Sequence, residues 1–528
     1  MKILLIHPNY PQTFWSFDKV LKMTGKKALV PPLGLITLAA LFPPDWEAEL
    51  VDMVFQKVTE CQWTETDVVM ISGMGIQHRG ILEMIGEAKR RGKFVVVGGA
   101  SVFHFPDDAL NSGADIVVVG EAEVNIDRLI EAVRQRESGI IISSDARANM
   151  EESPIPRFEL LELDKYVDMA IQYSRGCPFQ CEFCDVTLML GRKVRTKSPS
   201  QVIGELTKLY DLGWRRLVFF VDDNFIGNIH QTKLLLKELV PWMESRGMPF
   251  NFSTQASVNM AKDSILLEQM FRAGFFRVFL GIETPDEETL KEARKYQNTG
   301  VDLVSACKKI SGAGFQVIAG TILGFDNEKS GAGKRLIEFA NQTNIPEIFA
   351  TLLQAGPGTD MWVRLEKQNR LLCSDFDTIS NQTGLINFVP TRSLEEIVTE
   401  FVDLYQTLYN PKNYLKRVYE HYSQMNPPKV KKSFKLPYLM ELKAALTAIY
   451  RNGFVYESRL DFWNYFFKAI WRFPDRFDRF VTALVVAEHY YEFRQTLISN
   501  LSTQMEKLSD EEKNQFYIQE MPSPSPSI

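Results

Sequence analysis

Apolar and polar positions along the first 140 residues alternate in short blocks. Lys2 to His7 has the length and composition of a buried strand, and Pro31-Pro32-Leu33 opens an apolar helix that extends to about Phe42. Further strand-like runs lie at 49–53, 67–72, 94–97 and 115–119, with amphipathic segments at about 79–91 and 123–136. Strands that alternate with helices predict a parallel, doubly wound α/β sheet.

Three of these predicted strands end in glycine. The residues at their ends are Ser72-Gly73-Met74-Gly75, Gly98-Gly99-Ala100-Ser101 and Gly120-Glu121-Ala122-Glu123. Doubly wound sheets bind ligands beyond the carboxyl ends of their strands, and glycine there allows a large, flat ligand to approach the backbone closely. Each glycine equally fits a tight strand-to-helix turn, and both interpretations stay open. The three strand ends carry no GxGxxG fingerprint, so we do not expect a dinucleotide.

A second α/β unit follows a linker, which we expect at 141–169. Ser153-Pro154-Ile155-Pro156-Arg157 breaks both periodicities, and apolar residues such as Phe158 favour an ordered connector. Strand-like runs then lie at 169–173, 216–221, 250–254, 277–281, 315–319 and 347–351, and helical ones at about 199–213, 229–245, 263–273, 300–313 and 330–342. Six βα units predict a partial (β/α)6 barrel at 170–390, with its site at the carboxyl ends of the strands.

Three cysteines directly after the first barrel strand form the most specific motif. Cys177, Cys181 and Cys184 have the spacing CxxxCxxC. A zinc site normally has four ligands, and no fourth Cys or His lies nearby. Three thiolates suit a [4Fe–4S] cluster in which one iron lacks a protein ligand. That iron can bind the amino and carboxylate groups of S-adenosylmethionine and pass an electron to the sulfonium, which releases a 5′-deoxyadenosyl radical.

This spacing is the motif of the radical S-adenosylmethionine superfamily, and longer strings narrow the resemblance. They are Ser174–Asp185, Gly191–Arg195, Phe219–Asn228, Phe279–Pro285, Lys295–Asn298 and Gly356–Thr359. Over residues 1 to about 480 the chain resembles the cobalamin-dependent (class B) branch that includes the hopanoid C-2 methylase. The resemblance implies a Rossmann-like cobalamin-binding domain at 1–140, a radical S-adenosylmethionine barrel at 170–390 and a helical C-terminal domain at 391–515.

The resemblance also suggests residues for each cofactor. For S-adenosylmethionine they are Phe183, Asp222, Asp223, Asn224, Gln255 and Glu283, although the three carboxylates also suit helix N-caps. For cobalamin they are Ser72, Gly73, Met74, Gln77, Gly98, Gly99, Ala100, Gly120 and Glu121. The usual DxHxxG signature of a cobalt-ligating histidine is absent. We therefore interpret His78, in Ile76-Gln77-His78-Arg79-Gly80, as a solvated histidine at a helix start.

Composition excludes several classes of protein. The 528 residues include 60 Lys or Arg and 66 Asp or Glu, a net charge of −6, which argues against a nucleic-acid partner. No membrane span or secretory signal is recognisable, and six cysteines are too few for a disulfide scaffold, so we expect a cytoplasmic protein. Cys61, Cys307 and Cys373 stand alone and suggest no second cluster.

The C-terminal region combines basic and aromatic residues. Residues 411–450 hold eight Lys or Arg against two Asp or Glu, densest at Pro427–Lys435, and aromatic residues crowd 462–473. The aromatic residues either form an ordinary helical core or belong to a cap that covers the barrel, binds an apolar substrate and touches anionic lipid. The tail at 516–528 is of low complexity and expected to be disordered.

The favoured function is radical C-methylation of an unactivated carbon in a bulky apolar substrate, of hopanoid, isoprenoid or tetrapyrrole type. The resemblance implies two uses of S-adenosylmethionine, as methyl donor through methylcobalamin and as radical source, with electrons from a flavodoxin or ferredoxin. One alternative is a cobalamin-binding radical oxidoreductase or cyclase without methyl transfer. Another is a non-catalytic cobalamin or iron–sulfur sensor.

Overall fold

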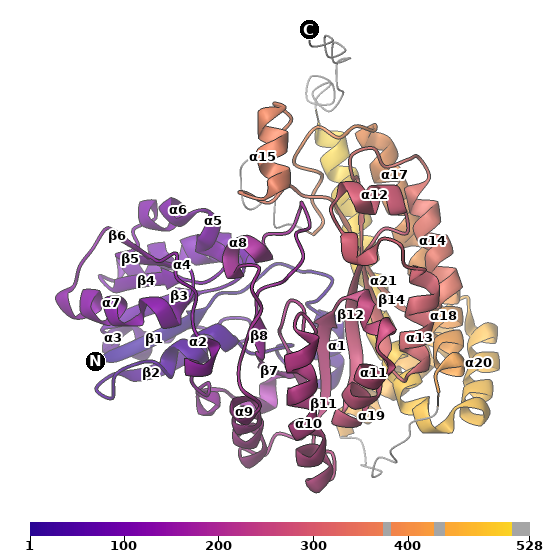
Figure 1. Ribbon diagram of the computed structural model, residues 1–528, viewed down its shortest axis with the longest axis horizontal. Coiled ribbons are helices and arrows are strands. Elements are labelled where there is room, and N and C mark those ends of the chain that lie inside the picture. Colours follow the sequence, from indigo (N-terminus) through magenta and orange to yellow (C-terminus); the bar gives the residue numbers. More distant parts are fainter. Residues whose placement is uncertain (373–381, 427–438, 509–528) are drawn as a thin grey trace.

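The computed structural model describes residues 1–372, 382–426 and 439–508. Its strands form two six-stranded parallel sheets and one two-stranded ribbon. The N-terminal sheet and the second sheet lie side by side in Figure 1, and the C-terminal helices lie on the far side of the second sheet. The Lys-rich stretch at 427–435, Cys373 and the tail at 516–528 lie outside the described residues.

The first sheet has the strand order β2-β1-β3-β4-β5-β6. Its strands are β1 (Lys2–His7), β2 (Glu47–Asp52), β3 (Val68–Ser72), β4 (Phe94–Gly98), β5 (Ile116–Val119) and β6 (Ile140–Ser143). The helices that pack on it are α2 (Leu33–Ala39), α3 (Glu60–Glu65), α4 (His78–Arg90), α5 (Ser101–His104), α6 (Pro106–Asn111) and α7 (Ala122–Gln135). Helix α1 (Asp18–Thr24) follows β1 in the chain but packs against the C-terminal helices. Leu4 and Ile6 of β1 enter one apolar core, while Ile3 and Leu5 enter the other. Both faces of the sheet are therefore buried, and the expected doubly wound fold is confirmed.

Two details differ from the sequence expectation. The helix that opens at Leu33 ends at Ala39 and not near Phe42. A sixth strand, β6, occupies the start of the expected linker and pairs with β5 from Ile116↔Ile140 to Val119↔Ser143. Three consecutive isoleucines at 140–142 are the signal for this strand, because β-branched residues favour strands. The connector beyond β6 contains the short 3-10 turns η2 (Met150–Glu152), η3 (Phe158–Leu160) and η4 (Leu163–Lys165).

The second sheet has the order β14-β13-β12-β11-β10-β7, with every neighbouring pair parallel. Its strands are β7 (Met169–Ile171), β10 (Leu217–Phe220), β11 (Asn251–Ala256), β12 (Phe275–Glu283), β13 (Gln316–Leu323) and β14 (Glu347–Leu352). The helices between them are α9 (Pro199–Asp211), α10 (Ile229–Ser245), η5 (Val258–Lys262), α11 (Ser264–Ala273), α12 (Glu287–Glu292), η6 (Tyr296–Asn298), α13 (Leu303–Gly312) and α14 (Ala332–Thr343). Because β14 and β7 are both edges, the sheet is a partial barrel, as expected.

A small ribbon interrupts the first βα connection of this barrel. Strands β8 (Ser174–Arg175) and β9 (Arg195–Thr196) pair antiparallel, so that Arg175 and Arg195 are cross-strand partners. Between them lie the three cysteines and helix α8 (Val186–Leu190). We call residues 176–194 the cysteine loop. The ribbon brings the two ends of this loop together.

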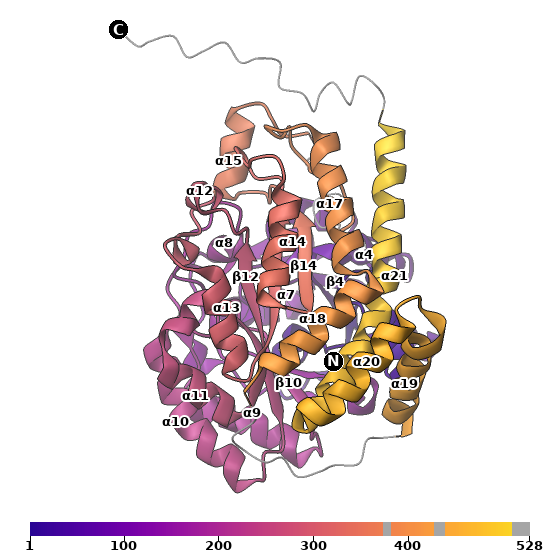
Figure 2. The same ribbon diagram turned by 90° about the vertical axis from the view of Figure 1, so that its right-hand side faces the viewer.

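The C-terminal helices cover the open β14 side of the barrel. They are α17 (Leu394–Leu408), α18 (Pro411–Gln424), α19 (Leu439–Tyr450), π-helical η7 (Arg451–Val455), α20 (Arg459–Arg472), η8 (Pro474–Arg476) and α21 (Phe477–Lys507). Helix α15 (Asp360–Lys367) precedes them and lies against the cysteine loop, where Met361 N donates to Glu182 O at 3.0 Å. Tyr405 of α17 and Tyr409 just after it donate hydroxyl hydrogen bonds to the β14 carbonyls of Ala350 and Ile348, at 2.8 and 2.7 Å. Figure 2 shows α17, α18 and α21 packed along this side. No helix within the described residues is both long and apolar enough to cross a membrane.

Candidate functional site

The cysteine loop holds its three thiols by backbone hydrogen bonds from several directions. Cys177 N donates to Gly191 O at 3.2 Å, Cys184 N donates to Cys181 O at 3.2 Å, and Glu182 N donates to Ala293 O beyond β12. All three cysteines are half-buried and free of disulfides. Burial raises the pKa of Cys177 and that of Cys184. Cys177 and Cys184 therefore ionise readily only when a cation or metal compensates their burial.

Gly176, immediately before the first cysteine, has no room for a side chain. A Cβ there would lie 2.8 Å from the carbonyl oxygens of Gly191 and Lys193. Its φ of +93° also lies in the region that favours glycine. The beginning of the cysteine loop thus passes directly against its end at this residue. This close contact fixes the path of the backbone from β8 to Cys177.

A positive charge and an amide lie against the cysteine loop. Lys295 Nζ forms an ion pair with Glu283 Oε1 at 2.5 Å. Burial by itself would lower the pKa of Lys295, but the carboxylate of Glu283 and the charge of Cys181 outweigh burial and raise it. Gln297 Nε2 lies 3.5 Å from Cys181 Sγ as a donor. The string Lys295–Asn298 contributes to the family resemblance, but no sequence motif assigns these two residues a role.

The donor set fits an iron–sulfur cluster. Three free cysteine thiols lie on one loop, and Lys295 and Gln297 offer a charge and a hydrogen bond suited to an anionic group. In residues 1–372, 382–426 and 439–508 no group of three or more His, Cys, Asp or Glu is arranged to hold a metal ion. A cluster differs from a single ion in this respect, because each thiolate binds a different iron.

Asp222, just after β10, binds the segment that leads into the cysteine loop. Its carboxylate is fully buried and accepts hydrogen bonds from Tyr173 N at 3.0 Å, from Ser174 Oγ at 2.5 Å and from Ser174 N. Burial raises the pKa of Asp222 to about 6, although these hydrogen bonds oppose the shift. Asp222 is not a helix cap, because Asn228 caps α10. Its carboxylate holds the chain between β7 and β8.

Asp223 and Glu283 lie near the cysteine loop in different electrostatic settings. Burial raises the pKa of Asp223 to about 6, and the carboxylates of Asp222 and Asp185 add to that shift. Glu283 has a φ of +63° and its carboxylate pairs with Lys295. The cap of the helix that follows Glu283 is Asp286, so Glu283 is not an N-cap either.

The remaining S-adenosylmethionine candidates are placed as follows. Asn224 is buried, and its amide lies 3.3 Å from Ser257 Oγ. Gln255 is half-buried on β11, and its backbone carbonyl accepts a hydrogen bond from Phe225 N at 2.9 Å. Phe183, inside the cysteine loop, packs edge-on against Phe325 with ring centroids 5.8 Å apart.

At the glycine-rich edge of the first sheet, the exposed atoms belong mainly to the backbone. Gly99 and Ala100 are exposed, and the Met74 side chain is 59% exposed. A Cβ on Gly99, whose φ is +92°, would collide with Ser72 Oγ and approach Gly73 O at 3.3 Å. Tight chain packing therefore accounts for glycine at position 99. Gly120, with a φ of +96°, has only Ser144 O at 3.9 Å, which leaves room beside its backbone.

Two polar residues of this edge are buried and form hydrogen bonds within the first domain. Gln77 is 1% exposed; it accepts a hydrogen bond from Met74 N at 2.9 Å and donates to Pro8 O. The expectation that His78 is solvated is wrong. The ring is 4% exposed, with Nδ1 3.0 Å from Ser101 Oγ and Nε2 3.2 Å from Asp108 Oδ2. His78 does begin α4, and the turn packs its ring against α5 and α6.

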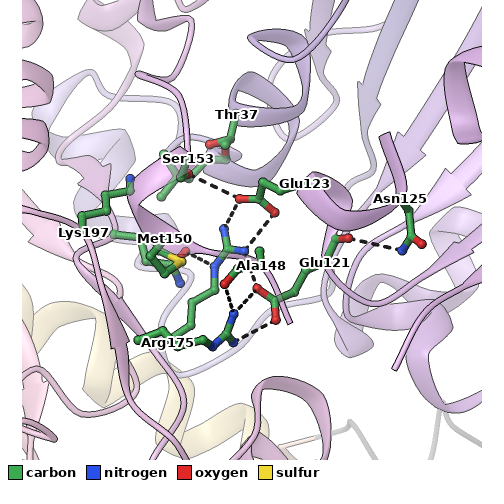
Figure 3. Close-up of polar contacts among 12 residues, drawn as sticks. Thr37, Glu121, Glu123, Asn125, Ala148, Met150, Ser153, Arg175 and Lys197 are labelled. Carbon is green, nitrogen blue, oxygen red and sulfur yellow. Dashed lines mark hydrogen bonds and ion pairs between the residues drawn. The ribbon is translucent and has the colours of Figure 1, made fainter. Parts of the chain in front are cut away.

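Glu121 takes part in a buried network that joins the first sheet to the barrel (Figure 3). Arg175 Nη1 donates to Glu121 at 2.8 Å, and its two terminal nitrogens donate to both oxygens of Glu123. Arg195 donates to both oxygens of Glu121 at 2.8 and 2.9 Å. The Glu121 carboxylate is 4% exposed. Its side chain is thus occupied by two guanidinium groups. We call these four residues the Glu–Arg network.

A cleft of about 450 Å³ lies beside the cysteine loop. Its lining consists of Pro178, Phe179, Arg192, Lys193, Val194, Ile226, Gly227, Asn228, Ile229 and Asn259. Arg192 and Lys193 are exposed. The cleft therefore combines two cations with an apolar wall formed by the cysteine loop itself.

Comparisons with known proteins agree with this arrangement. Models of the B12 binding domain match residues 26–130, of the radical SAM superfamily 171–340 and of a domain of unknown function 359–503. An uncharacterized methyltransferase of Synechocystis is 46% identical over 96% of this chain and 94% of its own. The hopanoid C-2 methylase of Rhodopseudomonas palustris is 32% identical over 92% of both chains.

Solved structures share the fold. The methyltransferase TsrM of Kitasatospora setae, determined with cobalamin and a [4Fe–4S] cluster, superposes with a TM-score of 0.61 at 15% identity, over 92% of this chain and 99% of its own. The cobalamin-dependent enzyme OxsB superposes with a TM-score of 0.59 at 15% identity, over 98% of this chain and 83% of its own.

The chain belongs to the cobalamin-dependent (class B) radical S-adenosylmethionine enzymes, in the branch that includes hopanoid C-2 methylase. It is a radical S-adenosylmethionine methyltransferase whose cofactors are a [4Fe–4S] cluster, S-adenosylmethionine and cobalamin.

Proposed function

We propose that this enzyme methylates an unactivated carbon of a bulky apolar substrate of the hopanoid, isoprenoid or tetrapyrrole type. The observation that carries the proposal is a contact between the two regions that would hold the cofactors. The Glu–Arg network ties the glycine-rich edge of the first sheet to the base of the cysteine loop. The 32% identity to hopanoid C-2 methylase supports the substrate class. A carbon that is neither acidic nor nucleophilic requires radical chemistry. This requirement explains why one chain combines a cluster loop with a cobalamin-binding edge.

The cysteine loop would hold the cluster through Cys177, Cys181 and Cys184. When bound, the cluster supplies the electron that cleaves S-adenosylmethionine, and cobalamin carries the methyl group. Phe183, Asp223, Asn224, Gln255 and Glu283 would line the S-adenosylmethionine site, with Asp222 ordering the chain beside it. The Lys295 ammonium would compensate the negative charge of the cluster and keep Glu283 in place.

The first sheet would hold cobalamin against backbone. Gly98, Gly99 and Gly120 offer backbone without side chains at the edge, Ala100 adds only a methyl group, and Met74 offers an exposed apolar side chain. Ser72, Gly73 and Gln77 would shape this edge from below, since the Gln77 amide is bonded to Met74 and Pro8. The protein's part is to exclude water and to hold three reactants in line.

The test uses protein purified without oxygen and loaded with the [4Fe–4S] cluster and cobalamin. S-adenosylmethionine with a deuterated methyl group is supplied with a hopanoid, an isoprenoid or a metal-free tetrapyrrole, each in detergent micelles. We expect one labelled methyl group in one of the three, together with 5′-deoxyadenosine. Deoxyadenosine with an altered but unlabelled substrate would overturn methylation and favour the cyclase alternative. A relative of that kind, the anaerobic magnesium-protoporphyrin IX monomethyl ester cyclase of Synechocystis, is 26% identical over 57% of this chain and 65% of its own.

We propose further that an acidic flavodoxin or ferredoxin docks at the cleft beside the cysteine loop. Exposed Arg192 and Lys193 lie at this cleft, and Pro178, next to Cys177, forms part of the same wall. Opposite charge steers such encounters and makes them sensitive to salt. Charge reversal of both cations should slow cluster reduction by flavodoxin but not by dithionite. Equal rates with flavodoxin would contradict this docking site.

We also propose that the face formed by α19, η7 and α20 contacts an anionic lipid surface. Trp471, Leu460 and Phe454 are 87%, 80% and 61% exposed, and Lys468 and Arg472 are exposed beside them. Apolar side chains flanked by cations are typical of peripheral membrane contact. We expect Trp471→Ser to weaken sedimentation with phosphatidylglycerol vesicles, and Ile265→Ser, an exposed site on α11, to leave it unchanged. Equal binding of both variants, or self-association through this face, would overturn the proposal.

A further inference from the structure

The four residues of the Glu–Arg network are close in the chain to the glycine-rich edge of the first sheet or to the cysteine loop. Glu121 follows Gly120 at the carboxyl end of β5, and Glu123 lies in the first turn of α7. Arg175 ends β8 two residues before Cys177, and Arg195 begins β9 at the other end of the cysteine loop. Because the two arginines are cross-strand partners, they present their guanidinium groups from the closed base of the loop.

The geometry of the network is specific. Arg175 and Arg195 each donate through two terminal nitrogens to one carboxylate, and Glu121 accepts from both arginines. Both arginines donate further hydrogen bonds: Arg175 Nε donates to Gln172 Oε1 at 2.8 Å, and the terminal nitrogens of Arg195 donate to Ala148 O and Leu190 O. Bidentate pairs of this kind define both distance and orientation.

The network is nearly dry and balanced in charge. The four side chains are between 4% and 14% exposed, and two carboxylates face two guanidinium groups. A buried ion pair adds little net stability compared with an apolar contact, because desolvation offsets the attraction. Such a pair does favour one arrangement of its partners over displaced ones, since a displaced charge stays buried without its partner. The network is thus better suited to setting a geometry than to raising stability.

We infer that Glu121, Glu123, Arg175 and Arg195 are positioning residues that set the separation between the cysteine loop and the glycine-rich edge of the first sheet. This inference rests on the proposed function, in which the two edges carry the cluster and cobalamin. A displacement of about 1 Å between reacting groups can reduce a rate on the order of 100-fold. The network acts through backbone: it orients Cys177 from one side and Gly120 from the other, without touching a reactant.

The test measures the separation directly and needs no substrate. Holoenzyme with a reduced cluster and cob(II)alamin contains two unpaired spins, whose dipolar coupling in pulsed electron paramagnetic resonance falls with the cube of their distance. Arg175→Lys keeps the charge but loses the bidentate geometry, and Glu121→Gln keeps the shape but loses the charge. The matched controls are Arg128→Lys and Glu137→Gln, which alter a more exposed ion pair between α7 and a residue two positions beyond its end.

We expect both network variants to retain wild-type iron and cobalt contents while their spin–spin coupling broadens and shifts, and both controls to match the wild type. Coupling that superposes on the wild type in the network variants would overturn the inference. Loss of cobalt with iron retained would also overturn it, because Glu121 would then be a cofactor ligand. Insoluble protein from both network variants would indicate a purely structural role. If the wild type couples normally but transfers no methyl group, the proposed function fails and the positioning role stands.

Discussion

The two sheets present their carboxyl ends in opposite ways. At the barrel, reactive side chains face the site: three free thiols, with Lys295 and Gln297 against them. At the first sheet, polar side chains turn away from the edge, since Gln77 bonds internally and Glu121 bonds to arginines. What remains exposed there is backbone and Met74. A cluster needs side-chain donors, whereas a wide, flat cofactor needs a surface without obstructing side chains.

The comparison is sharpest at the thiols. Cys181→Ala should abolish cluster assembly and 5′-deoxyadenosine formation, while cobalamin binding at the first sheet persists. Iron analysis and deoxyadenosine release under dithionite check the loss of the cluster, and cobalt analysis checks the retained cobalamin. Cys61→Ala is the control, because that thiol is exposed on α3. Retained deoxyadenosine formation in the Cys181 variant would mean that the cysteine loop does not hold the cluster.

Substitutions in the Glu–Arg network, which connects the two regions, should have the next largest effect. Arg195→Ala leaves Glu121 partly unpaired in a dry site, which should lower the free energy of unfolding by about 3–5 kcal/mol. Arg128→Ala removes a more exposed pair and should cost about 0–1 kcal/mol. Urea unfolding measures both. Similar losses for the two variants would show that the network contributes no more than a surface ion pair.

The backbone of the cysteine loop can be separated from its thiols. Gly176→Ala should cost about 1–3 kcal/mol from backbone strain alone. It should also disturb cluster assembly, because its Cβ meets two carbonyl oxygens at 2.8 Å. Gly92→Ala is matched, with a φ of +68° and nothing within 4 Å of the added Cβ. Equal iron contents in the two variants would contradict a role of the close contact at Gly176.

The pH dependence of stability distinguishes a buried carboxylate of the site from one outside it. The pKa of Asp223 is raised from 3.8 to about 6, and that of Asp168 from 3.8 to about 7, in both cases chiefly by burial. Above pH 3.8 the unfolded chain has released a proton that the folded protein keeps. The free energy of unfolding therefore falls as the pH rises from the unfolded pKa to the folded pKa, by roughly 1.4 kcal/mol for each pH unit between the two.

Asparagine at either position should remove this fall and flatten the pH dependence measured by urea unfolding. Only Asp223→Asn should also weaken S-adenosylmethionine binding, since Asp168 lies at the start of β7. If both variants flatten the profile and bind S-adenosylmethionine equally well, Asp223 has no part in that site.

The sequence predicted the barrel well because its signals are local. Expected strands at 216–221, 250–254 and 347–351 fall within one or two residues of β10, β11 and β14. The helix at 229–245 agrees at both ends with α10, which Asn228 caps. Hydrophobic periodicity and caps act over a few residues, so they are legible without a structure.

Other features were missed because their cause is distant. His78 was expected in solvent, but α5 and α6 bury it beside Ser101 and Asp108. Lys295 carries no motif of its own, and its meaning comes from Glu283 and Cys181, which reach it only through the barrel. Glu121 was assigned to a cofactor, whereas Arg175 and Arg195 occupy its carboxylate.

The sequence by itself determined the chemistry of the barrel, because ligand spacing on one loop is a property of consecutive residues. It also determined the two parallel sheets, because strand and helix periodicities are local. Only the tertiary structure decided how the sheets face each other and which polar side chains remain free. Those choices depend on partners far apart in the chain, such as Glu121 and Arg195, whose burial and charge become coupled only when the two sheets pack together.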